Sequence, residues 1–214
     1  MSQESSEAQT RRELIDPAVT AAGWDNPPHS VTPEEAVTDG RIIPLGQKKA
    51  KRGSQLFADY VLRYNRDFKI AVVEAKKKGV PADTGLQQAQ EYAEMLDVKF
   101  AYATNGLDII EFDFLTGVEK FVDDFPTPDE LWHRLNGNLK LDDEAAETLL
   151  TPYDLTSGKT PRYYQEFAIN RAVEGMVQGK KRLLITMATG TGKRVFGSTV
   201  QVKSTLRVSG VLGK

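Results

Sequence analysis

The chain has 214 residues, of which 40% are apolar and 27% charged, enough for one large or two small globular domains with a hydrophobic core. The absence of cysteine excludes disulfides and thiolate metal sites, and the two histidines, His29 and His133, are too far apart in sequence to suggest a histidine zinc site. No apolar run approaches the length of a membrane span and the N terminus lacks signal-peptide character, so we expect a cytoplasmic protein without membrane contact. Because the net charge is only −2, we expect nucleic acid to bind only through local basic patches, such as 48–52 and 76–78.

The N-terminal quarter predicts one helix and one short strand. Residues 1–9 are polar and are expected to be disordered. Thr10 and Glu13 have the spacing of a helix capping box, and apolar residues at helical spacing continue to Gly23. The segment 26–33 is interpreted as a proline-rich loop. A strand is expected at 41–45, followed by a basic loop at 46–54.

Residues 55–76 predict the β-hairpin around which the chain is organised. Two runs rich in β-branched and aromatic residues are separated by the polar turn 63–67. The second run is apolar from Ile70 to Val73, as in a strand buried on both faces, and then reaches Glu74 and Lys76. These two residues are spaced i, i+2 and therefore project from one face of a strand. Asp59 lies on the first strand of the hairpin, and we expect it to join them at one edge of the sheet.

Charged groups at the edge of an apolar sheet need partners or a metal. The carboxylates of Asp59 and Glu74 and the carbonyl of Ala75 offer the hard oxygen ligands that Mg²⁺ prefers. Lys76 could orient a water activated by the metal or stabilise developing negative charge. A Glu–Lys salt bridge at a strand end is the alternative interpretation, and the spacing alone does not exclude it.

Asp59 and the segment Glu74-Ala75-Lys76 resemble the catalytic motif of the PD-(D/E)xK nuclease family, with Ala58 in place of the proline. The resemblance implies a restriction-endonuclease-like fold and Mg²⁺ ligation by Asp59, Glu74 and Ala75. Some members also carry an acidic residue on the first helix, which here would be Glu13.

The next predicted helix, at 85–96, carries Gln88 and Tyr92 one turn apart. A surface glutamine beside a half-buried tyrosine is the simplest interpretation. The spacing Gln-x-x-x-Tyr also resembles an accessory motif of RecB-like nucleases, in which the glutamine reaches toward the active site and DNA. The full set of catalytic residues implied by these resemblances is Asp59, Glu74, Lys76, Gln88, Tyr92 and Glu13.

Strands are expected at 100–104 and 107–113, because Asn105-Gly106 between them is a strong hairpin-turn signal. Residues 10–122 are therefore expected to form an α/β domain, with an α+β mixed-sheet core flanked by helices. Residues 123–160 are interpreted as a linker that packs on this domain, with a helix at 128–135 and acidic, loop-rich sequence after it.

Residues 161–214 contain the parts of a phosphate-binding loop. A helix from Arg162 precedes an apolar run, 183–186, expected to be a buried strand, and a glycine-rich loop ending in lysine follows. Backbone N–H groups and the lysine of such a loop hold the β- and γ-phosphates of a nucleotide. The segment resembles the first ATPase motif of superfamily 2 helicases and translocases. The nucleotide-binding residues implied by this resemblance are Gln165, Thr189, Gly190, Thr191, Gly192 and Lys193.

The nucleotide-binding pattern breaks after Lys193. Arg194 occupies the position of the Thr or Ser that would ligate Mg²⁺, and the following residues lack a helical period. We therefore expect 161–214 to be an incomplete, truncated P-loop motor domain without ATPase activity of its own.

The order of these motifs over residues 10–193 resembles the restriction (R) subunit of type I restriction-modification enzymes. This resemblance implies a site-specific deoxyribonuclease that uses Mg²⁺ to cut double-stranded DNA, driven by ATP-dependent translocation. It also implies a complex with methylation and specificity subunits, with S-adenosylmethionine entering only through those partners. Two alternatives stay open: a helicase or translocase fragment whose nuclease-like domain is a non-catalytic docking domain, and a fragment that only docks onto partner subunits.

Overall fold

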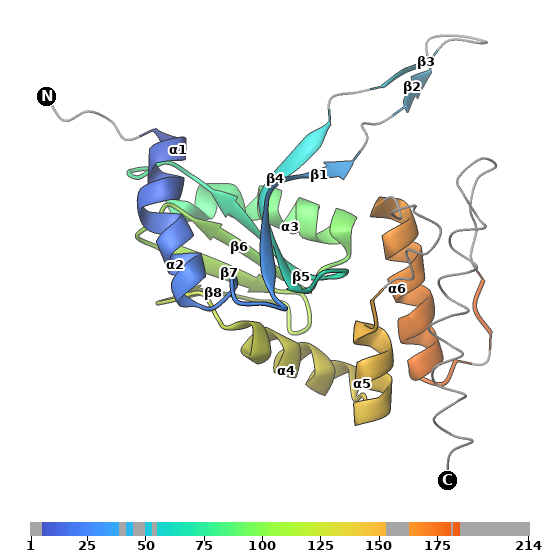
Figure 1. The fold of residues 1–214 in the computed structure, drawn as a ribbon. Coiled ribbons are helices and arrows are strands. Elements are labelled where there is room, and N and C mark those ends of the chain that lie inside the picture. The colour runs from blue at the N-terminus through green and yellow to red at the C-terminus, as the bar shows by residue number, and fades with distance from the viewer. Residues whose placement is uncertain are drawn as a thin grey trace, which may run out of the picture. The chain divides into compact units, whose positions relative to one another are not determined.

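The computed structural model describes residues 6–38, 42–44, 50–52, 55–152, 163–180 and 182–184 (Figure 1). The chain divides into two compact units, residues 1–135 and 136–214, and each is described here by itself.

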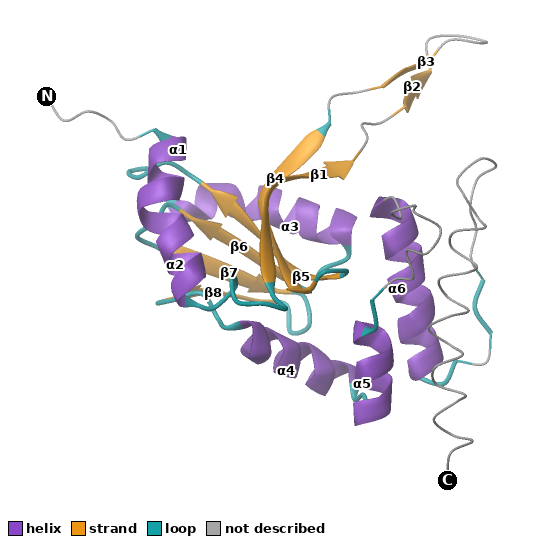
Figure 2. Ribbon diagram, viewed as in Figure 1, coloured by secondary structure: helices purple, strands orange, loops and turns teal. Residues whose placement is uncertain are grey.

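The first unit is built on a six-stranded mixed sheet with the order β1-β4-β5-β6-β7-β8 (Figures 1 and 2). β5 and β6 pair in parallel, and every other neighbouring pair is antiparallel. A two-stranded sheet pairs β2 with β3. The strands are β1 (Ser30–Thr38), β2 (Ile42–Pro44), β3 (Ala50–Arg52), β4 (Leu56–Asn65), β5 (Phe68–Ala75), β6 (Phe100–Thr104), β7 (Ile109–Asp113) and β8 (Val118–Val122).

The predicted hairpin is confirmed as β4 and β5, with Val61 opposite Val72. β5 is buried along nearly its whole length, and β4 and β6 pair with its two sides. The turn at Asn105-Gly106 is also confirmed: the Asn105 side chain accepts hydrogen bonds from the N–H groups of Leu107 and Asp108, and Gly106 has a φ of +83°.

Helix α3 (Leu86–Leu96) connects β5 to β6 and covers one face of the sheet. It begins one residue after the predicted start. Ala89, Tyr92, Ala93 and Leu96 form a core cluster with residues that lie side by side on neighbouring strands, including Val61, Val72 and Ala101. This packing holds the first turn of α3 against the end of β5.

The first helical segment runs through α1 (Glu7–Thr10), the π-helical turn η1 (Arg11–Ile15) and α2 (Asp16–Ala21). The expected capping by Thr10 is wrong, and residues 7–9 are helical. The Ser6 hydroxyl accepts from the N–H of Gln9, which moves the start of the helix one turn earlier. Thr10 is buried instead, and its hydroxyl accepts from the N–H of Lys78. Residues 1–5 lie outside the described part.

Helix α4 (Pro128–Leu139) begins with a capping box in which the Thr127 hydroxyl accepts from the N–H of Glu130, and the Glu130 carboxylate accepts from the N–H of Thr127. This return bond lowers the pKa of Glu130. Trp132 stacks on Tyr64, and Arg134 binds Glu111 of β7. Residues 128–135, the helix expected inside a linker, therefore pack on the sheet.

Two expectations along the first unit are wrong and one strand was not predicted, because local composition was a poor guide. β1 starts at Ser30, inside the expected proline-rich loop; it is an edge strand, where Pro33 need not donate to a second neighbour. Residues 50–52 of the expected basic loop form β3. β8 was not predicted because it is almost entirely exposed and lacks apolar alternation. The expected strand at 41–45 is confirmed for residues 42–44, which are the described part of it.

The second unit contains α5 (Asp143–Leu150) and α6 (Tyr163–Val177), which pack on one another. The expected loop at 143–150 is wrong, because the Asp142 side chain caps α5 by accepting from the N–H of Ala145. The expected buried strand is also wrong at Leu183 and Leu184, which are exposed and have no strand beside them among the described residues. The expected phosphate-binding loop, Thr189 to Lys193, and Arg194 lie outside the described residues.

Among the described helices, none combines the length and the apolar character needed to cross a membrane.

Candidate active site

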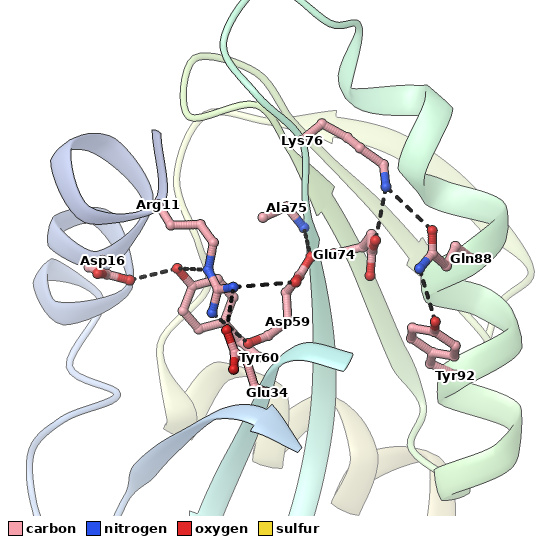
Figure 3. A network of polar contacts seen from close by, with 10 residues as sticks. All are labelled: Arg11, Asp16, Glu34, Asp59, Tyr60, Glu74, Ala75, Lys76, Gln88 and Tyr92. Atoms are coloured by element: carbon pink, nitrogen blue, oxygen red, sulfur yellow. Dashed lines mark hydrogen bonds and ion pairs between the residues drawn. The ribbon is translucent and has the colours of Figure 1, made fainter. Parts of the chain in front are cut away.

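The first half of β4, the C-terminal end of β5 and the start of α3 bring most of the predicted catalytic residues together (Figure 3). The N–H of Ala75 donates to Asp59 Oδ2 over 2.7 Å, which fixes the Asp59 carboxylate beside the residue that follows Glu74. The hairpin pairing accounts for this approach, because β4 and β5 are adjacent and antiparallel.

One chain of hydrogen bonds links the remaining polar residues of the site. Lys76 Nζ donates to Glu74 Oε1 over 2.9 Å, as expected for side chains spaced i, i+2 at the end of a strand. The same ammonium donates to Gln88 Oε1 over 3.3 Å. Gln88 Nε2 in turn donates to the hydroxyl of Tyr92 over 2.9 Å, across one turn of α3. The Gln-x-x-x-Tyr pair therefore touches Lys76 and is not a surface pair.

Glu74 is held in an environment that disfavours its charge. Burial raises the pKa of Glu74 to about 7; the hydrogen bond from Lys76 opposes this rise, while the negative charges of Asp59 and Glu7 add to it. Its second oxygen, Oε2, is buried and has no hydrogen-bond partner. A buried carboxylate oxygen without a partner is costly unless a ligand completes the site.

The residues at this edge fit a hard divalent cation. Asp59 and Glu74 supply carboxylate oxygens, the Ala75 carbonyl supplies a neutral one, and the orphaned Glu74 Oε2 is the observation that calls for a ligand. Across the described part of the chain, no group of three or more His, Cys, Asp or Glu side chains could hold a metal by itself. A cation bound here would depend on the backbone carbonyl and on water or substrate oxygens.

Glu13 does not join these residues. Its side chain is 53% exposed and contacts Gln9 and Arg12 of its own helical segment. The acidic residue of the first helix whose charge reaches Glu74 is Glu7, about two turns earlier. Glu7 was not predicted as part of the helix, because the cap was expected at Thr10, whereas the helix starts at Glu7.

Arg11 is a further residue of the site that was not among the predicted catalytic residues. It lies in the π-helical turn, a distortion that often occurs at functional sites. Its guanidinium donates to the backbone carbonyl of Asp59 over 3.2 Å and to Oδ1 over 3.5 Å, and Nε donates to the hydroxyl of Tyr60 over 3.1 Å. Tyr60 donates to Asp16 over 2.6 Å, so two residues of the first helical segment hold β4 at the site.

A cavity of about 450 Å³ is lined by Arg11, Asp16, Glu34 and Tyr60, among others. Neither Glu74 nor Lys76 lines it, so this cavity is not the place where the candidate metal ligands meet.

Of the predicted nucleotide-binding residues, the structure describes Gln165 alone, which is buried on α6. The others, Thr189 to Lys193, lie outside the described residues.

Comparison with known proteins finds similarity over most of this chain. Residues 31–126 match the family model "Type I restriction enzyme R protein N terminus (HSDR_N)", and residues 158–201 match "Type III restriction enzyme, res subunit". The chain is 40% identical over 195 residues to the Type I restriction enzyme EcoAI endonuclease subunit of Escherichia coli, covering 87% of this chain and 24% of that protein. It is 26% identical over 234 residues to the EcoKI endonuclease subunit of E. coli K12, covering 85% of this chain and 20% of that protein.

Among solved structures, a fragment assigned to an HsdR subunit of a type I restriction enzyme from Vibrio vulnificus YJ016 superposes with a TM-score of 0.86. The two sequences are 50% identical, and the match covers 94% of this chain and 38% of that chain. The chain thus spans about a quarter or less of the length of the curated relatives that it matches. With these similarities in sequence and fold, the chain belongs to the family of type I restriction enzyme R (HsdR) subunits.

Proposed function

We propose that this chain carries the Mg²⁺-dependent DNA endonuclease site of a type I restriction enzyme R subunit. The observation that carries the proposal is the buried, unpartnered Glu74 Oε2 beside Asp59 and Lys76. Support comes from two curated relatives, both of which are named endonuclease subunits. A salt bridge between Glu74 and Lys76 alone would leave Glu74 Oε2 buried without a partner, because Lys76 binds Oε1.

Asp59, Glu74 and the Ala75 carbonyl would hold the cation. When bound, Mg²⁺ would lower the pKa of a water molecule and neutralise charge on the DNA phosphate. The Ala75 N–H holds the Asp59 carboxylate in place, and Arg11 fixes the backbone of the same residue. Ligand positions set by backbone and guanidinium contacts need little rearrangement when a cation arrives.

Lys76 would place a positive charge where negative charge develops on the phosphate. Its ammonium is held between Glu74 and Gln88, and Gln88 is itself held by Tyr92. We assign Gln88 and Tyr92 a positioning role through this chain of hydrogen bonds.

We expect the 214-residue chain to bind one divalent cation at this site. Isothermal titration calorimetry with Mn²⁺ as the probe should detect binding to the wild type, and Glu74→Gln should weaken it by at least about tenfold, because a ligand contributes no less than its supporting residues do. Glu91→Gln is the matched control, since Glu91 is exposed on α3 and bonds to Gln87. Equal affinities of Glu74→Gln and the wild type would remove Glu74 from the metal site.

The same titration separates the alternatives. A translocase fragment with a non-catalytic docking domain, or a fragment that only docks onto partner subunits, has no use for a cation held by Asp59 and Glu74. Wild-type chain that binds no Mn²⁺ would therefore favour either of them over the nuclease.

We further propose that residues 161–214 begin the ATP-dependent translocase that moves DNA to this nuclease, in complex with methylation and specificity subunits. The match over residues 158–201 spans the glycine-rich segment that ends at Lys193.

ATP binding by the 214-residue chain is expected to be weak. Arg194 replaces the Mg²⁺-ligating hydroxyl, and Lys193 alone cannot hold the metal that bridges the phosphates. Calorimetry with ATP and Mg²⁺ tests this expectation, with Arg194→Thr as the variant expected to bind more tightly. Micromolar binding by the wild type would contradict it.

A further inference from the structure

Gly85 has a conformation that does not require glycine. It is the residue before α3, at the end of the 3₁₀ turn Ala82–Gly85, and it is buried. Its φ of −91° and ψ of −14° lie in the right-handed helical region, which any L-residue adopts. Backbone geometry therefore gives no reason for a glycine at this position.

The space around Gly85 does give a reason. A Cβ added to Gly85 would lie 3.0 Å from Lys76 Cε, 3.2 Å from Glu74 Cγ and 3.4 Å from Ala103 Cβ. The first two distances are tighter than ordinary van der Waals contact, so a methyl group here must displace one or both side chains. Both belong to the candidate active site.

Neither side chain can move without changing the site. Glu74 is almost fully buried and lies beside Ala103, its partner on β6. Lys76 is tied to Glu74 Oε1 and to Gln88 Oε1, which lies one turn beyond Gly85 on α3. A shift of a few tenths of an ångström in either side chain would therefore move the carboxylate and the ammonium relative to Asp59.

We infer that Gly85 is a positioning residue of the active site: its missing side chain lets the first turn of α3 pack against Glu74 and Lys76 and sets where their charged groups lie. This inference rests on the proposed nuclease function and deepens it. Because metal ligands must be placed to within about 0.5 Å, filling this space should affect cation binding more than folding.

The test compares Gly85→Ala with Gly137→Ala in the 214-residue chain. Gly137 is a helical glycine of α4 whose added Cβ would meet nothing within 4 Å, and it is not part of the site. Both variants should keep the wild-type melting midpoint or exceed it, because alanine restricts the unfolded chain more than glycine does. Only Gly85→Ala should weaken Mn²⁺ binding in calorimetry, by roughly tenfold, the low end of the loss in metal affinity seen when a residue that supports a metal ligand is changed.

A second measurement uses a full-length R subunit that carries this sequence, assembled with its partner subunits. Gly85→Ala should raise the Mg²⁺ concentration for half-maximal DNA cleavage and leave DNA-dependent ATP hydrolysis unchanged. A general folding defect would lower both activities.

The outcomes distinguish this inference from the proposed nuclease function on which it rests. A wild-type chain that binds no Mn²⁺ overturns the proposed function and the inference with it. Wild-type binding that is unchanged in Gly85→Ala overturns the inference alone. A Gly85→Ala chain that melts well below wild type overturns it as well, because Gly85 would then be needed for the fold.

Discussion

Replacing Glu74 by Gln, or Lys76 by Ala, is expected to abolish DNA cleavage by a full-length R subunit that carries this sequence, while ATP hydrolysis stays largely intact. Loss of a metal ligand or of the charge that stabilises the phosphate acts on the chemical step and should lower the cleavage rate by at least about 100-fold. Asp59→Ala should behave in the same way. The measurement is single-turnover cleavage of unmodified DNA beside ATP hydrolysis in the same preparation.

The adjacent glutamines of α3 give a matched control for this experiment. Gln88→Ala removes one of the two acceptors of Lys76 and should slow cleavage, although less than loss of Lys76 itself. Gln87→Ala should have no effect, because Gln87 is exposed and bonds only within its helix to Glu91. A Lys76→Ala enzyme that cuts at the wild-type rate would remove Lys76 from the catalytic set.

Arg134→Ala is expected to destabilise the first unit strongly. Glu111 is 1% exposed and receives hydrogen bonds from Tyr102 and from both terminal nitrogens of Arg134, at 2.9 Å and 2.8 Å. Removing the guanidinium leaves the buried carboxylate with only the Tyr102 hydroxyl and the half-exposed Lys120, whose ammonium is 3.5 Å away. We expect a cost of about 3 kcal/mol, the low end of the range for breaking a buried pair, because Arg134 is partly exposed. The melting midpoint of this unit should fall by roughly 10 °C.

Arg12→Ala is the control for that measurement. Arg12 is 77% exposed and pairs with Glu13 at 3.8 Å, so its loss should change the free energy of unfolding by about 1 kcal/mol or less. Adding Glu111→Gln to Arg134→Ala should restore part of the lost stability, because the buried negative charge of Glu111 is then gone. An Arg134→Ala chain with the same melting midpoint as Arg12→Ala would contradict this account of the Glu111–Arg134 network.

The pH dependence of the same network has a defined sign. Burial alone would raise the pKa of Glu111, but the hydrogen bonds from Arg134 and Tyr102 outweigh it and lower the pKa below its usual value. The stabilisation is therefore fully present above the unfolded-state pKa and is lost as the pH falls through the lower, folded-state pKa. Arg134→Ala should remove this acid-dependent part of the stability.

The sequence by itself determined the hairpin, the central buried strand and the turn at Asn105-Gly106. Each of these depends on residues close together in the chain: alternating or continuous apolar runs and a turn that favours left-handed backbone. The spacing of Glu74 and Lys76 is equally local, so their contact could be predicted. Gln88 and Tyr92 follow the same logic, since residues one helical turn apart always face the same side.

Only the tertiary structure decided which residues far apart in sequence contact one another. Arg11 reaches Asp59 across 48 positions, and Arg134 reaches Glu111 across 23, and no periodicity encodes such pairs. Glu7, and not Glu13, is the acidic residue of the first helix whose charge raises the pKa of Glu74, and the helix is capped at Ser6 rather than at Thr10. The space beside Gly85 likewise depends on how closely α3 approaches β5 and β6, and that distance is set by the packing of the whole sheet.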